Sequence, residues 1–221
     1  MFSVLTASHD RRTVAIHGPN GIGKTRLAIE FAKRYHTDYS AVIWLKATNE
    51  TTLKQSLVKT AERILWEHPS VRYLKNAVVN RNVDDIIKAV KRWLNEPSNK
   101  YWLIICDNYE YPQLNSNTAS IDNNDDTEYS DHSQGLIPKS FHVHDFLPES
   151  CHGAIIITTQ SSLFEVDQTI KLRKFESIED SLQLLESVSK RRSLRQDPAA
   201  VELSKKLGGL SFALKKKVAY N

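Results

Sequence analysis

Five short apolar stretches along the chain predict the strands of a sheet. Residues 13–16, 41–45 and 102–106 are rich in β-branched and other large apolar side chains, and residues 154–159 repeat the pattern. A shorter stretch at 168–172 predicts a fifth strand. Because the longer stretches are apolar at nearly every position, they are typical of parallel strands that are covered on both faces.

Segments with apolar residues three and four positions apart lie between the strands and predict helices. In residues 24–35, for example, Leu27, Ala28 and Phe31 share one helical face. Further helices are expected at 50–66, at 83–95 with Asn82 as the N-cap, at 179–189 and at 199–207. The alternation of strands and helices predicts an α/β fold with a parallel sheet.

Two further expectations follow from the same pattern. Residues 67–81, which contain Pro69, are predicted to be a connection without a helix of its own. The four tryptophans lie at apolar positions of the predicted elements, so we expect them in the core: Trp44, Trp66, Trp93 and Trp102.

Composition adds few constraints. The 221 residues carry a formal net charge of +4, but residues 113–135 hold five acidic side chains and no lysine or arginine, and they predict a disordered surface insertion. Cys106 and Cys151 do not suggest a disulfide scaffold. No stretch is long and apolar enough for a membrane span and no signal peptide is evident, so a cytoplasmic location is expected.

The residues after the first predicted strand carry the strongest chemical signal. Gly18, Gly23, Lys24 and Thr25 satisfy the phosphate-binding loop pattern, and the loop lies between a predicted strand and a predicted helix as that pattern requires. Backbone N–H groups of such a loop surround phosphate oxygens, the lysine reaches the β- and γ-phosphates, and the threonine hydroxyl ligates Mg²⁺. The candidate nucleotide-binding residues are Gly18, Pro19, Asn20, Gly21, Ile22, Gly23, Lys24, Thr25 and Arg26.

A carboxylate after the third predicted strand completes this hypothesis. Asp107 follows four apolar residues, and in proteins with a phosphate-binding loop such an aspartate holds Mg²⁺ together with the loop threonine, here Thr25. Asn108 stands at the next position, where efficient ATPases of this class usually carry an acidic residue that orients or deprotonates water. An amide cannot accept that proton, so Asp107 and Asn108 as the catalytic pair predict slow hydrolysis.

Four motifs in series resemble the NB-ARC domains of STAND-class, NLR-like proteins, and the resemblance is nearest to fungal members. The chain reads GPNGIGKTRLA from Gly18, WLIICDN from Trp102, GAIIITTQ from Gly153 and LGGLSFAL from Leu207. The resemblance covers residues 10–220 and implies a switch used in signal transduction and innate immunity. In such a switch, ADP holds the closed state and exchange for ATP permits self-association or contact with protein partners.

The resemblance also implies an architecture and further site residues. It implies a three-layer P-loop NTPase fold with strand order 5-1-4-3-2 in a domain at 1–174, followed by part of a small helical subdomain at 175–221. By position, Thr158, Thr159 and Gln160 would face the γ-phosphate, and Leu210 and Ser211 would lie near the adenine base. Regions that usually follow in the family are absent, so the chain is interpreted as truncated.

Two departures from the family pattern bear on the switch. Gln160 stands where the family commonly has an arginine, and an uncharged amide should discriminate ATP from ADP less well. Ser211 replaces a proline that contacts adenine in the family. A regulatory switch therefore has two alternatives. One is a degenerate interaction module that no longer switches, and the other is an efficient ATPase or kinase.

Other chemical patterns are weaker. His142 and His144 with Asp145 resemble half of a metal site without further ligands at a standard spacing, so surface histidines are the preferred interpretation. The basic runs at 190–195 and 215–217 include no recognisable base-reading module. We therefore expect ATP or ADP with Mg²⁺ as ligands, and neither nucleic acid nor a membrane as partner.

Overall fold

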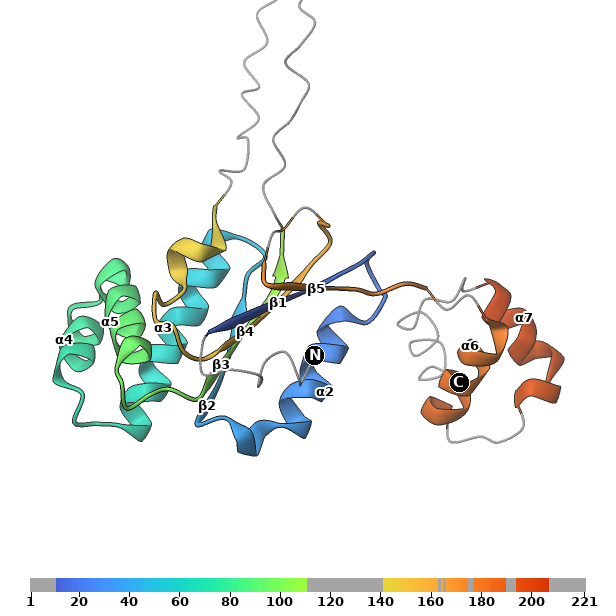
Figure 1. Cartoon of the computed structure of the whole chain (residues 1–221), viewed down its shortest axis with the longest axis horizontal. Helices are drawn as coiled ribbons and strands as arrows, with labels where there is room; N and C mark the ends of the chain where they lie inside the picture. Colours follow the sequence, from blue (N-terminus) through green and yellow to red (C-terminus); the bar gives the residue numbers. More distant parts are fainter. Residues whose placement is uncertain are drawn as a thin grey trace, which may run out of the picture.

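Strands and helices alternate along the chain in the computed structural model (Figure 1), which describes residues 11–110, 141–162, 164, 166–174, 177–189 and 194–206. The predicted insertion at 113–135 lies outside these residues. The elements, in chain order, are β1 (Arg12–His17), α2 (Lys24–Arg34), η1 (His36–Asp38), β2 (Ala41–Lys46), α3 (Glu50–Glu67), α4 (Arg72–Asn80), α5 (Val83–Asn95), β3 (Trp102–Tyr109), η2 (Val143–Phe146), β4 (Ala154–Thr159), β5 (Gln168–Lys171), α6 (Ile178–Ser189), η3 (Leu194–Gln196) and α7 (Pro198–Lys206).

The five strands form one parallel sheet in the order β2-β3-β4-β1-β5. This is the order 5-1-4-3-2 that the family resemblance implies, so the predicted α/β fold class is confirmed. β1 lies between β4 and β5, and β4 lies between β1 and β3. The ends of β1, β3 and β4 therefore meet at the carboxyl edge of the sheet, where α/β proteins bind ligands.

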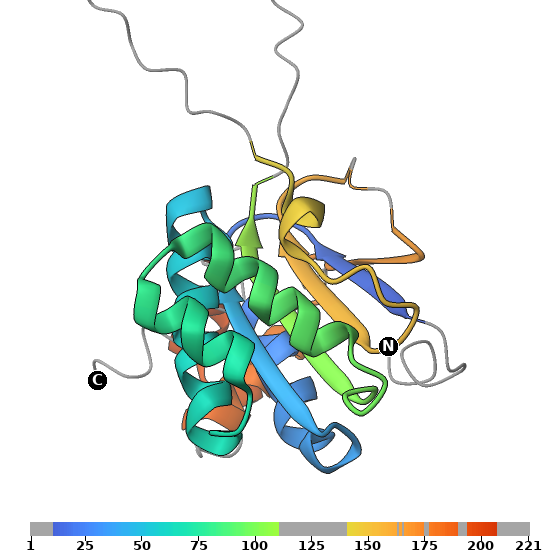
Figure 2. The same cartoon turned by 90° about the vertical axis from the view of Figure 1, so that its left-hand side faces the viewer.

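Helices cover both faces of the sheet and form two separate cores. Helices α3, α4 and α5 cover one face, which is turned to the viewer in Figure 2, and α2 packs on the opposite face. On the α2 face, Phe31 packs with Val14 and Ile16 of β1 and with Ile156 of β4. Burial of these apolar side chains stabilises the layers at roughly 25 cal/mol for each Å² removed from water.

N-cap residues mark the start of two helices, α3 and α5, where the sequence predicts them. The Asn82 side chain accepts hydrogen bonds from the backbone N–H groups of Asp84 and Asp85 and caps α5 as predicted. Asn49 and Thr52 exchange hydrogen bonds in a capping box at the start of α3.

Several sequence-based expectations are wrong in detail. Residues 67–81 contain the helix α4, whose Leu74 and Ala77 are buried against α3 and α5. Two tryptophans are not in the core: Trp44 is 37% exposed and Trp66 is 77% exposed. Trp44 lies on an edge strand, where only part of the sheet face is covered, and Trp66 stacks under the guanidinium of Arg63 at the end of α3.

β3 extends past the predicted end at Asp107 to Tyr109. Tyr109 pairs with Thr159 of β4 after an irregularity in the ladder. Its ring is buried and makes edge-on contacts with Phe141 and Phe164 at centroid distances of 5.4 Å. These aromatic contacts hold the strand in the sheet beyond the polar pair at 107–108.

The helices α6 and α7 pack against each other through Leu182, Leu185 and Ala200. They lie in the region where a helical subdomain is expected, and that subdomain remains a prediction. In the part of the chain that the structure describes, none of the helices is both long and apolar enough to span a bilayer.

Gly153, immediately before β4, is a position where the structure leaves no room for a side chain. Its φ is 87°, and a Cβ would overlap the indole ring of the fully buried Trp102. Gly153→Ala should lower the free energy of unfolding by about 3 kcal/mol, because strain and overpacking combine. Urea unfolding measures the effect. Gly153→Asn should do no better, since asparagine tolerates this backbone but its Cβ meets the same ring; recovery by asparagine would show that strain alone matters.

Candidate functional site

The loop between β1 and α2 is closely packed at its first residue. A Cβ on Gly18 would lie 2.7 Å from the carbonyl oxygen of Leu172, which follows β5. Leu172 in turn donates its backbone N–H to the carbonyl of His17 at 2.8 Å. The continuation of β5 thus fixes the start of the loop, and only glycine fits there.

Lys24, the first residue of α2, is folded back into the loop. Its side chain is buried, and the ammonium donates to the carbonyl oxygens of Gly18 (2.8 Å) and Pro19 (3.0 Å). Burial lowers the pKa of Lys24 from its ordinary value, while the charge of Asp107 opposes that effect. The ammonium belongs to the first residue of α2, and the first turn of this helix has no acidic residue. A positive charge at a helix N-terminus favours the binding of an anion.

His17 and Lys171 also lie close to the loop. His17, the last residue of β1, is buried, and its pKa is lowered by burial and by the positive charges of Lys171 and Lys24. A lowered pKa favours the neutral ring at pH 7. The positive charge next to the loop therefore comes from the two lysines rather than from this histidine.

Three side chains from three elements meet at the other side of the loop. The Thr25 hydroxyl of α2 donates to Oδ1 of Asp107 on β3 at 2.8 Å. The Thr158 hydroxyl of β4 donates to the same oxygen at 2.7 Å. The structure thus brings together Thr25 and Asp107, the two residues predicted to hold Mg²⁺.

The residues at 107–108 form a bulge opposite Thr158. Cys106 pairs with Ile157 and Tyr109 pairs with Thr159, so Asp107 and Asn108 together face one residue of β4. Asn108 adopts a left-handed conformation with φ 61°, and its backbone N–H donates to the Thr158 hydroxyl at 2.8 Å. Asparagine is one of the few residues enriched in this conformation. The backbone geometry therefore gives a structural reason for asparagine at position 108, in addition to the chemical one.

The oxygen atoms of Thr25 and Asp107 fit a magnesium ion. Mg²⁺ prefers oxygen ligands, and in nucleotide sites it takes one or two protein groups together with phosphates and water. The Thr25 proton is directed at Asp107, so the lone pairs of this exposed hydroxyl are available to a cation. Among the described residues, no three His, Cys, Asp or Glu side chains form a cluster that could hold a metal ion. That part of the chain therefore contains no such metal site built from protein groups alone.

The remaining predicted residues occupy less specific places. Ile22 is buried, Asn20 and Gly21 are exposed, and Gly23 caps α2. Arg26 is exposed and forms an ion pair with Glu30 at 2.6 Å. Thr159 is buried and accepts a hydrogen bond from the backbone of Ser161, and Gln160 is exposed. Leu210 and Ser211 lie outside the described residues.

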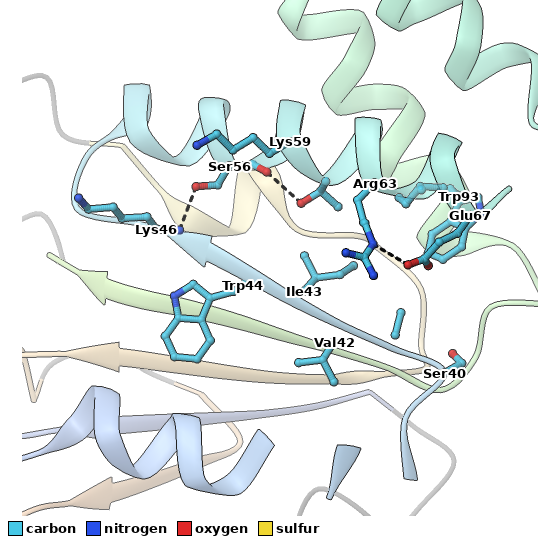
Figure 3. Close-up of a pocket in the computed structure, with 13 residues that line it drawn as sticks. Ser40, Val42, Ile43, Trp44, Lys46, Ser56, Lys59, Arg63, Glu67 and Trp93 are labelled. Atoms are coloured by element: carbon cyan, nitrogen blue, oxygen red, sulfur yellow. Dashed lines mark hydrogen bonds and ion pairs between the residues drawn. The ribbon is translucent and has the colours of Figure 1, made fainter. Parts of the chain in front are cut away.

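A groove of about 600 Å³ lies apart from this loop, between the edge strand β2 and helix α3 (Figure 3). Ser56 accepts a hydrogen bond from the backbone of Lys46 at its rim, and Arg63 is paired with Glu67. Val42 and Trp44 point away from α3 in this view. None of the predicted nucleotide-binding residues lines the groove.

Thr158, which the resemblance places near the γ-phosphate, makes two contacts that the sequence analysis does not predict, and its position relative to a nucleotide stays a prediction. Its hydroxyl faces Asp107 and Asn108. The signal was present in the sequence, because a polar residue near the end of a buried strand lies level with Asp107 once the two strands are placed side by side. Spacing along the chain does not reveal this contact, since the two residues are 51 positions apart.

One of the comparisons with known proteins, a sequence match to an NLR-like protein, agrees with the resemblance. No protein-family model matches the chain. Over 219 residues, or 96% of the chain, it is 26% identical to a nucleotide-binding leucine-rich repeat (NLR)-like protein of Hyaloscypha variabilis, and it spans about 20% of that protein's length. A crystal structure of a STAND protein with a tetratricopeptide repeat sensor from Pyrococcus horikoshii is 17% identical, with a TM-score of 0.49, and matches 98% of this chain and 28% of that one.

The left-handed backbone at Asn108 leads to a testable consequence. Asn108→Ala should lower the free energy of unfolding by about 1 kcal/mol, whereas Asn108→Gly should be close to neutral, because glycine adopts positive φ without steric cost. Urea unfolding of both variants measures this. Equal losses in the two variants would assign the stabilisation to the asparagine side chain instead of its backbone.

Proposed function

We propose that this chain is a nucleotide-binding regulatory switch that binds ATP or ADP with Mg²⁺. The observation that carries the proposal is the convergence of the Lys24 ammonium and the Thr25–Asp107 pair at one helix N-terminus. The similarity to the nucleotide-binding leucine-rich repeat (NLR)-like protein of Hyaloscypha variabilis supports it. Signalling through contact with protein partners, in the cytoplasm, is the setting that we propose for this switch.

Different groups around the loop would bind different parts of the ligand. Backbone N–H groups at the start of α2 would face the phosphates, and Lys24 would exchange its two carbonyl partners for β- and γ-phosphate oxygens. This exchange is favourable because an anion compensates a buried ammonium better than neutral carbonyl groups do. Magnesium, when bound, neutralises phosphate charge, and Thr25 and Asp107 are the residues that would hold it.

Hydrolysis by this site should be slow. Asn108 is beside Asp107, and its amide can orient water but cannot take a proton from it. The next carboxylate along the chain is that of Glu110, two residues beyond Asn108. Glu110 is exposed and follows the buried Tyr109. A switch needs bound nucleotide to persist, so the absence of a strong base next to Asp107 favours a regulatory role over an efficient ATPase or kinase. The exposed Gln160 supplies no charge to sense a γ-phosphate.

The direct test is calorimetric titration of ADP and ATP with Mg²⁺ into the wild-type chain and the Lys24→Ala variant. Wild type should bind with micromolar or tighter affinity. Loss of a charge-assisted contact to phosphate is worth about 2 kcal/mol, so Lys24→Ala should weaken binding by at least tenfold. Lys33→Ala is the matched control, because it removes one exposed positive charge from the same helix and should leave affinity within twofold.

Three outcomes would change the conclusion. A folded wild-type chain that binds neither nucleotide would contradict the switch and favour the interaction module. Equal losses in Lys24→Ala and Lys33→Ala would show that net charge drives binding rather than the loop. Multiple-turnover hydrolysis at the median enzyme rate, about 10 per second, would favour an ATPase over a switch.

A further inference from the structure

The hydroxyl of Thr158 has both of its hydrogen-bonding roles engaged within the protein. It donates to Oδ1 of Asp107 at 2.7 Å and accepts from the backbone N–H of Asn108 at 2.8 Å. Thr158 is fully buried. A carboxylate only accepts and a backbone N–H only donates, so the direction of each bond follows from the groups themselves.

In this arrangement the Thr158 hydroxyl has no free proton for a phosphate oxygen. A hydroxyl carries one proton, and binding a phosphate oxygen would require that proton. The proton is already directed at Asp107, and releasing it would leave that oxygen with Thr25 alone among the described residues. The role of Thr158 is therefore exerted through Asp107 and Asn108.

Two donors approach the same carboxylate oxygen from different elements. Thr25 reaches Oδ1 of Asp107 from α2, and Thr158 reaches it from β4. Thr25 is exposed and is itself a candidate magnesium ligand, so it changes its surroundings when a cation and nucleotide arrive. Thr158 is buried in a central strand and provides the partner that stays in place.

The bulge makes this contact possible. Asp107 and Asn108 together face Thr158, and the left-handed turn at Asn108 directs its N–H to the Thr158 hydroxyl instead of to a backbone carbonyl. One hydroxyl therefore fixes both the backbone after Asp107 and the carboxylate itself. Outer partners of this kind orient metal-binding carboxylates, and their removal typically costs 10–100-fold in metal affinity.

We infer that Thr158 is a positioning residue that holds the Asp107 carboxylate ready for the magnesium of a bound nucleotide. The inference rests on the proposed nucleotide-binding function and goes beyond it. According to this inference, Thr158 contributes to the magnesium dependence of nucleotide affinity and does not itself contact the nucleotide. A merely structural threonine would instead affect binding equally with and without the metal.

The test compares ADP affinity by calorimetry in Mg²⁺ and in EDTA. Thr158→Val keeps the shape of the side chain and removes the hydroxyl. The ratio of affinities in Mg²⁺ and EDTA should fall at least fivefold in this variant, while affinity in EDTA stays within twofold of wild type. Thr158→Ser restores the hydroxyl and should restore the ratio.

Two further variants isolate the effect. Thr13→Val on β1 is the matched control, since Thr13 is also buried and its hydroxyl has no hydrogen-bond partner among the described residues; its ratio should match wild type. In an Asp107→Asn background, Thr158→Val should add less than twofold, because both substitutions act through one carboxylate. If Thr158→Val does not fold, Thr158→Cys gives the same comparison with a weak thiol donor and should show a smaller loss in the ratio.

The outcomes separate this inference from the proposed function. Wild type that binds no nucleotide contradicts the proposed function. Wild type that binds nucleotide equally well in Mg²⁺ and EDTA, or a Thr158→Val variant with an unchanged ratio, overturns the inference and leaves nucleotide binding intact. Equal loss of affinity in Mg²⁺ and EDTA also overturns it, because the hydroxyl would then support the fold and not the metal.

Discussion

Parallel pairing of β1, β4 and β3 is the constraint on which the candidate site depends. His17 pairs with Thr159 and Cys106 pairs with Ile157, so the glycine loop, Thr158 and Asp107 lie at one edge of the sheet. A slip of one residue would turn each of these side chains to the other face. The buried positions of β1, β3 and β4 oppose such a slip, because the two apolar faces pack against different helices. The site chemistry is therefore held by the same burial that holds the layers together.

The buried Lys24 ammonium is a charge that groups of the protein itself compensate. The two loop carbonyls compensate part of the lost hydration, and the carboxylate of Asp107 acts on the same charge from the other side. These contacts hold the loop around the lysine, and we expect a bound anion to replace the carbonyl partners within a loop that is already formed. Preorganisation of this kind lowers the cost of ordering on binding.

The sequence predicts strongly periodic and motif-bearing parts well and the less regular parts poorly. The strand order follows from the family resemblance, and the glycine pattern predicts Lys24 and Thr25 as candidate site residues because their chemistry requires a fixed spacing. Helix α4 was missed because Pro69 suggested a break, whereas burial of Leu74 against neighbouring helices decides the outcome. Exposure of Trp44 depends on which strand lies at the edge, which local periodicity cannot reveal. Tertiary pairing, and not propensity, decided these cases.

Asn108 shows how one residue can have two explanations that lead to the same observation. Its chemistry suggests a site that lacks a strong base, and its left-handed backbone suggests a residue chosen for conformation. The two explanations are connected, because the bulge that positions Asp107 requires positive φ at the next residue. Glutamate is disfavoured in that conformation, so a glutamate here would strain the backbone next to Asp107, the proposed magnesium ligand, whereas aspartate tolerates positive φ much as asparagine does. The geometry at 107–108 therefore disfavours a glutamate at the position of Asn108, and the slow turnover that we propose is consistent with the shape of the strand as well as with the missing base.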